Sequence, residues 1–167
     1  MVILGIDPGL ASTGYGVVSR RGGRLVALDG GVVATDAGMR EERRLAEIHD
    51  AVATLLAEHA PQALALEQLY FGQNARTAFA VGQARGAVML AAGQHGVECF
   101  SYTPQQVKGA VCGSGRAQKD QVARMVAVLL ALPAPPRGPS AADALAVAIC
   151  HANRAPLALA LAGEERS

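Results

Sequence analysis

Apolar residues along the chain fall into five short runs of the kind that form β-strands. The first run is continuous and typical of a buried strand, and a turn rich in Gly, Ser and Pro follows it. Two further strands, joined by a tight Arg-Gly-Gly turn, predict an antiparallel meander. The other two strands alternate with helical segments. The predicted strands are residues 2–6, 15–20, 24–34, 62–67 and 97–102.

Helical periodicity accounts for most of the remaining chain. Pro61 marks the end of one helix and Pro104 opens another. The predicted helices are residues 39–59, 74–93, 104–111, 119–132 and 140–153. Strands and helices in this order predict an α/β fold, with a five-stranded mixed sheet flanked by helices. We expect residues 1–153 to form a single domain and residues 154–167 to be a poorly ordered tail.

Composition narrows the class of protein. Hydrophobic residues make up 51% and charged residues 17%, as in a globular domain. The net charge of +1 neither indicates nor excludes a polyanionic partner. Three cysteines without a CxxC motif disfavour a disulfide framework and a structural zinc site. The chain shows no signal peptide and no apolar run of 18 residues, so we expect a cytoplasmic protein without membrane contact.

Three carboxylates stand in apolar surroundings. Asp7 ends the first strand, Glu67 ends the fourth, and Asp143 lies in the last helix. A carboxylate in such a place carries a desolvation penalty of several kcal/mol unless it finds a partner. The apolar segments hold too few cations to pair with all three. Because hard divalent ions bind oxygen ligands of this kind, the pattern predicts a Mg²⁺ or Mn²⁺ site.

Each acid also has a purely structural interpretation. An acid at a strand end can stabilise a turn. Ser140 and Asp143 have the spacing of a capping box, in which Ser140 begins the helix and Asp143 reaches back to its backbone N–H. Such a contact stabilises a helix by roughly 1 kcal/mol and needs no metal. From spacing alone, both interpretations stay open.

Four collinear segments resemble the RuvC family of Holliday junction resolvases over residues 1 to about 153: GIDPGLASTGYGVV, LALEQLYFGQNARTAFAVGQARGAVMLAA, YTPQQVKGAVCGSGRAQKDQV and AADALAVAICH. The resemblance implies an RNase H-like fold and a homodimer that uses Mg²⁺ or Mn²⁺, with two ions per active site. It also implies paired nicks in two strands of like polarity across a four-way DNA junction. The products would carry 5′-phosphate and 3′-hydroxyl ends. The family acts in DNA recombination and repair, with a branch-migration complex as partner.

The same resemblance assigns roles to individual residues. Asp7, Glu67 and Asp143 match the metal-binding catalytic acids of the family, and Lys108 and Lys119 match lysines near the scissile phosphate. A fourth metal position, usually an acid or a histidine, holds Ser140, which predicts a weaker or water-mediated ligand. His151, eight residues beyond Asp143, is an alternative ligand or a structural histidine. The predicted DNA contacts are Tyr70, stacked on a base, Lys108, Arg116, Lys119 and Arg76.

Alternatives to a junction resolvase remain. Another RNase H-like nuclease, such as a ribonuclease H, would share the acids, and a non-catalytic junction-binding module would fit the neutral Ser140. An actin-like ATPase or sugar kinase is disfavoured because the chain lacks a second phosphate loop. Gly82 and Gly86 lie four residues apart in one predicted helix, where they permit either core packing or the close helix approach of a homodimer.

Overall fold

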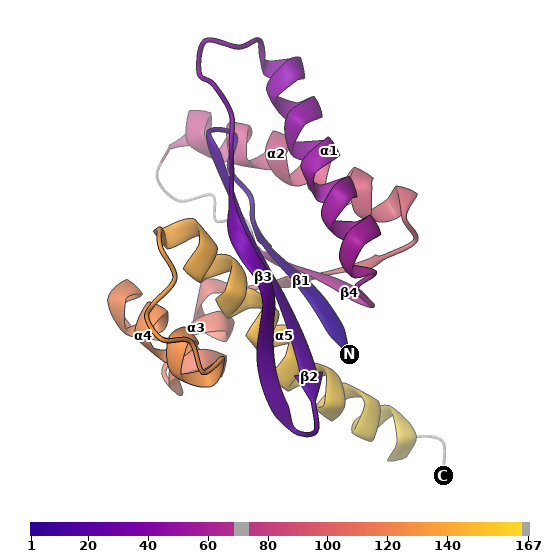
Figure 1. Ribbon diagram of the computed structural model, residues 1–167, viewed down its shortest axis with the longest axis vertical. Coiled ribbons are helices and arrows are strands. Elements are labelled where there is room, and N and C mark those ends of the chain that lie inside the picture. The colour runs from indigo at the N-terminus through magenta and orange to yellow at the C-terminus, as the bar shows by residue number, and fades with distance from the viewer. Residues whose placement is uncertain (69–73, 165–167) are drawn as a thin grey trace.

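The computed structural model describes residues 1–68 and 74–164, which form one mixed sheet with helices on both faces (Figure 1). The sheet has the strand order β3-β2-β1-β4-β5. The first three strands pair antiparallel, and β1, β4 and β5 pair parallel. The strands are β1 Val2–Asp7, β2 Ser12–Arg21, β3 Arg24–Ala34, β4 Ala63–Glu67 and β5 Glu98–Tyr102.

Helices form the two outer layers. Helices α1 and α2 cover one face of the sheet, and α5 covers the other together with α3 and α4 (Figure 1). The helices are α1 Glu41–His59, α2 Ala75–Gln94, α3 Pro104–Cys112, α4 Lys119–Leu129 and α5 Pro139–Glu164. Among these described helices, none is both long and apolar enough to cross a bilayer.

The side chains of β1 alternate between two hydrophobic cores. Leu4 and Ile6 are fully buried against α1 and α2, whereas Ile3 is fully buried in the core beneath α5. By the same alternation, Asp7 lies on the α5 face of the sheet. The strand therefore delivers its terminal carboxylate to the layer that contains α5.

Two glycines allow α5 to lie very close to the sheet. A methyl group on Gly5 of β1 would overlap the backbone carbonyl oxygen of Ala144, and one on Gly14 of β2 would overlap that of Ser140. Only a residue without a Cβ atom fits at either place. The start of α5 is thus seated directly on the strands that surround Asp7.

The five-stranded mixed α/β sheet that the sequence predicts is confirmed, with differences at element ends. Strand β2 begins at Ser12, before its predicted start, because Ser12 and Thr13 pair with the end of β3 and Gly14 pairs with Asp7 of β1. Helix α4 ends at Leu129, before its predicted end, and the chain turns at Ala131 with φ 52°. Helix α5 continues past its predicted end to Glu164, through an alanine- and leucine-rich sequence that includes Pro156. The boundary at residue 153 and the disorder of the tail stay predictions.

We predict that Gly14→Ala destabilises the fold strongly. The added methyl group must displace the first turn of α5 from β2, and overpacking of this kind costs about 1–3 kcal/mol or more. Urea denaturation measures the change in the free energy of unfolding. Gly93→Ala in α2 is the matched control, because its methyl group meets no neighbour within 4 Å and should stabilise the helix by up to about 1 kcal/mol. Equal stability of wild type and Gly14→Ala would contradict the close seating of α5.

Candidate active site at the carboxyl ends of β1 and β4

Asp7 and Glu67 end two neighbouring parallel strands. Ile6 of β1 is in register with Leu66 of β4, so the two acids occupy the next position on each strand. Ala65 belongs to the core beneath α5, and the alternation along β4 puts Glu67 on that same face. The two carboxylates therefore share one edge and one face of the sheet.

Asp143 reaches this edge from the first turns of α5. Gly14 pairs with Asp7 across β1 and β2, and the backbone of Ser140 lies over Gly14. Ala144, the residue after Asp143, lies over Gly5 on the α5 face of β1. Elements far apart in the sequence are thus brought together, and the structure places all three predicted acids in one neighbourhood.

The carboxylates disturb each other's ionisation. Burial, followed by the charges of Asp143 and Glu67, raises the pKa of Asp7 from 3.8 to about 7, although Lys119 opposes the shift. Burial and then Asp143 raise the pKa of Glu67, against the opposing charges of Lys119 and Lys108. Negative charge therefore exceeds the local positive charge. Such surplus charge in a desolvated place is what a divalent cation would neutralise.

Two lysines lie on the same side of the molecule as the acids. Lys119 begins α4, and its Nζ lies 3.4 Å from Oδ2 of Asp143. Its side chain is 77% exposed, whereas that of Asp143 is 26% exposed, so the ammonium group stays open to a ligand from solvent. Lys108 on α3 lies near enough to Glu67 to act on its pKa.

The donor set fits a hard cation in its chemistry, although the side chains are not arranged around one. In the described part of the chain, no three His, Cys, Asp or Glu residues are arranged so that they could hold a metal ion. Asp143 forms its ion pair with Lys119 instead. Asp7, Glu67 and Asp143 supply carboxylate oxygens, and the Cβ atom of Ser140 lies over Gly14, beside Asp7. Their roles as ligands stay predictions.

The capping-box interpretation of Ser140 and Asp143 is wrong. Helix α5 begins at Pro139, a residue favoured at the first helical position, so Ser140 is already inside the helix. The carboxylate of Asp143 contacts Lys119 from the neighbouring helix. Asp143 is thus turned toward the acid site and away from its own helix end.

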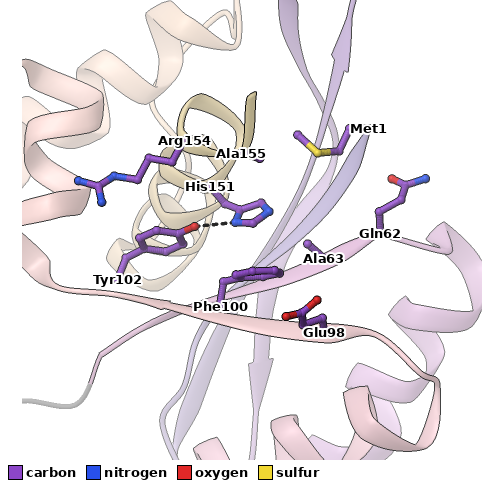
Figure 2. A pocket seen from close by; sticks show the side chains of 9 residues that line it. All are labelled: Met1, Gln62, Ala63, Glu98, Phe100, Tyr102, His151, Arg154 and Ala155. Carbon is purple, nitrogen blue, oxygen red and sulfur yellow. Dashed lines mark hydrogen bonds between the residues drawn. The ribbon is translucent and has the colours of Figure 1, made fainter. Parts of the chain in front are cut away.

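His151 lies in a different part of the molecule. Its Nδ1 and the hydroxyl of Tyr102 form a hydrogen bond of 2.6 Å, and its ring packs at a tilt against Phe100 with a centroid distance of 4.5 Å (Figure 2). These rings line a largely apolar pocket of about 390 Å³ whose other walls include Met1 and Gln62, at the start of β1 and just before β4. Asp7 and Glu67 stand at the opposite ends of those strands. The structure therefore favours the structural interpretation of His151.

Of the predicted DNA contacts that the structure describes, Lys108 is half-buried and the others are exposed. Arg116, in the loop between α3 and α4, and Arg76, in the first turn of α2, are both exposed. Arg124 of α4 pairs with Asp120 at 3.3 Å, on its own helix. Tyr70 lies outside the described residues.

Sequence patterns missed two residues that shape the site. The buried hydroxyl of Thr13 donates to the carbonyl of Gly9 at 2.7 Å and thereby closes the turn after Asp7. Arg85 of α2 donates from Nη1 to the backbone carbonyl of Glu67 at 3.2 Å. The spacing of Thr13 after the Asp-Pro-Gly turn could have indicated the first contact. No local signal indicates the second, because its acceptor is a backbone atom of another element.

Comparison with known proteins identifies the family. The family model of the crossover junction endodeoxyribonuclease RuvC matches residues 3–151. The chain belongs to the RuvC family. The RuvC of Moorella thermoacetica is 51% identical over 156 residues, which cover 93% of each chain. That of Thermomicrobium roseum is 52% identical over 151 residues, which cover 90% of this chain and 92% of the relative.

Solved structures agree with this membership of the RuvC family. RuvC from Thermus thermophilus is 40% identical, with a TM-score of 0.88, over 95% of this chain and 97% of the other. The same protein in complex with a Holliday junction substrate gives a TM-score of 0.91 at 41% identity, over 95% and 96%. The yeast mitochondrial resolvase gives a TM-score of 0.58 at 13% identity, over 89% of this chain and 77% of the other, and shares the fold. The predicted RNase H-like fold is confirmed.

We predict that ionisation of Asp7 destabilises the metal-free protein. Its pKa rises from 3.8 to about 7 on folding, so the stability linked to its protonated form is complete below about pH 4 and is lost as the pH rises through 7. Relative to Asp7→Asn, wild type should lose on the order of 3 kcal/mol of unfolding free energy between pH 4 and 8. Urea denaturation in a chelator, at several pH values, measures this difference.

The control for this titration is Glu47→Gln, which removes an exposed carboxylate on α1. Its stability should follow that of wild type at every pH. A constant difference between wild type and Asp7→Asn across this range would show that Asp7 ionises normally and would refute the prediction.

Proposed function

We propose that this chain is a metal-dependent endodeoxyribonuclease that resolves Holliday junctions. In this proposal it acts in recombination and repair, where it nicks two strands of like polarity and leaves 5′-phosphate and 3′-hydroxyl ends. The observation that carries the proposal is the convergence of Asp7, Glu67 and Asp143 at one sheet edge, where burial and mutual repulsion raise the pKa of Asp7 to about 7. Membership of the RuvC family, whose relatives are named crossover junction endodeoxyribonucleases, supports it.

The acids would hold two ions, Mg²⁺ or Mn²⁺, in each active site. When bound, these ions supply Lewis-acid activation of water and neutralise charge on the phosphate. Asp7, at the centre of the acids, would contact both ions, and Glu67 and Asp143 would hold one each. Ser140 offers a neutral hydroxyl and would bind weakly or through water.

Basic residues would bind the DNA backbone near these acids. The exposed ammonium group of Lys119 and that of Lys108 can donate to the oxygens of the scissile phosphate and stabilise its developing charge. Arg116 and Arg76 would contact other phosphates, and Tyr70 would stack on a base. We also propose a branch-migration complex as partner, from family resemblance. We retain the predicted cytoplasmic location because three cysteines without a CxxC motif fit a reducing compartment.

We predict that Asp7→Asn abolishes cleavage of a synthetic four-way junction while junction binding persists. Loss of a ligand to both ions removes several kcal/mol of transition-state stabilisation, or about 10³-fold or more in rate. Gel assays with Mg²⁺ or Mn²⁺ measure cleavage, and fluorescence anisotropy without metal measures binding. Glu47→Gln, with the same change of charge on a distant helix, should cut like wild type.

The substrates in this assay separate the alternatives. Preferred cleavage of an RNA–DNA hybrid would indicate a ribonuclease H, and metal-independent binding without any cleavage would indicate a junction-binding module. Full nicking of junctions by Asp7→Asn would refute the proposed site.

We further propose that the chain works as a homodimer joined through α2. This helix exposes Phe79, Leu90 and Met89, which are 69%, 57% and 43% exposed. Gly86 lies among them and has open space around it, so another helix can approach closely. Exposed apolar side chains gathered on one helix are typical of an interface. A two-fold dimer would supply the two sites that paired nicking needs.

We predict that Leu90→Glu converts the dimer to a monomer, because it would bury a charge in an apolar interface. Analytical ultracentrifugation at micromolar concentration measures the mass. Val128→Glu is the matched control, since Val128 is likewise an exposed apolar residue, at 69% against 57% for Leu90, but lies on α4. A dimeric Leu90→Glu variant, or a wild type that is already monomeric, would contradict an interface through α2.

A further inference from the structure

Arg85 joins helix α2 to the ends of two strands. Its Nη1 donates to the backbone carbonyl of Glu67, the last residue of β4, at 3.2 Å. Its Nη2 donates to Oγ of Ser101 in β5 at 2.7 Å. A single guanidinium group thus holds α2, β4 and β5 together at the edge where the acids converge.

The contact falls where the pairing of β4 with β1 ends, while Glu67 itself still pairs with Tyr102 of β5. Strand β1 pairs with β4 through Ile6 and Leu66, and the pairing ends there. One hydrogen bond beyond Glu67, from the N–H of Gln68 to the carbonyl of Tyr102, closes the side toward β5. The carbonyl of Glu67 accepts its hydrogen bond from Arg85. The backbone of Glu67 determines where its carboxylate can reach. By holding that backbone, Arg85 restricts the position of the carboxylate.

We propose that Arg85 is a positioning residue for the metal-binding carboxylate of Glu67, acting through the backbone carbonyl of that residue. This inference rests on the proposed function of the acids. Metal ions tolerate little displacement of their ligands, and groups that orient a ligand typically change metal affinity 10–100-fold when they are removed. The planar fork of arginine reaches two acceptors on separate strands, whereas the single nitrogen of lysine cannot reproduce that geometry.

The test measures Mn²⁺ binding to the DNA-free protein by electron paramagnetic resonance, and junction cleavage as a function of Mn²⁺ concentration. For Arg85→Lys we expect the Mn²⁺ concentration at half-saturation to rise at least about 10-fold. Cleavage should fall at low Mn²⁺ and recover at high Mn²⁺, while junction binding without metal stays unchanged. Recovery at high metal is a response that a merely destabilised protein would not give.

Arg20→Lys is the matched control. Arg20 of β2 also donates to a backbone carbonyl, that of Ala152, at 3.0 Å, and to a side-chain oxygen, that of Asn153, at 2.8 Å. Both of its bonds come from Nη2, and they join a strand to a helix far along α5 from Asp143. Arg20→Lys should therefore leave the Mn²⁺ affinity unchanged.

Two further variants separate the possible failures. Ser101→Ala removes one acceptor and keeps Arg85, so it should raise the half-saturating Mn²⁺ concentration by a smaller factor. If Arg85→Lys does not fold, an unchanged Mn²⁺ affinity in Ser101→Ala overturns the inference. Glu67→Gln should lose Mn²⁺ binding outright. If Glu67→Gln loses Mn²⁺ but Arg85→Lys binds it like wild type, only the role of Arg85 is wrong. If Glu67→Gln binds and cuts like wild type, the proposed metal site itself is wrong.

Discussion

The close contact between α5 and strands β1 and β2 is the constraint on which the candidate site depends. Gly5, Gly14 and Gly16 lack the Cβ atoms that would hold the helix away, and a methyl group on each would overlap an atom of α5. The close approach of α5 to the sheet brings Asp143 near enough for its charge to raise the pKa values of Asp7 and Glu67. A helix seated farther from the sheet would keep the fold class but separate the acids. The glycines therefore belong to the chemistry of the site as well as to its packing.

The same constraint makes the site a local weakness of the metal-free protein. Burial separates Asp7 from water, and the neighbouring acids repel its charge, so the folded chain holds a carboxylate that ionises only near pH 7. Lys119, which pairs with Asp143, offsets part of this charge, and Lys108 opposes that of Glu67. Functional sites often contain such unfavourable arrangements, which the rest of the fold must stabilise. Here two fully buried apolar layers, one on each face of β1, supply that stability.

The sequence predicts those parts of the site that local patterns encode. Asp7 and Glu67 follow apolar strands, and strand alternation together with a parallel pairing is enough to expect them at one edge. Long-range contacts are not encoded in this way. The alternative in which Ser140 caps the helix is wrong because the helix begins at Pro139, which spacing alone does not reveal. Local sequence patterns do not indicate Arg85, because its partners are a backbone carbonyl and a serine on another strand. Proximity in space, rather than residue type, gives it a role.

Ser140 shows how these constraints combine. Its Cβ atom lies over Gly14, beside Asp7, so a carboxylate in its place would add a fourth negative charge to a group of three. In the metal-free chain, that charge would repel Asp7 and Asp143 further and raise the pKa of Asp7 above its present value of about 7. Serine avoids this repulsion but supplies a weaker ligand. In the proposed site, metal binding would then depend more heavily on Asp7, Glu67 and Asp143, and the proposed placement of Glu67 by Arg85 would gain importance for the same reason.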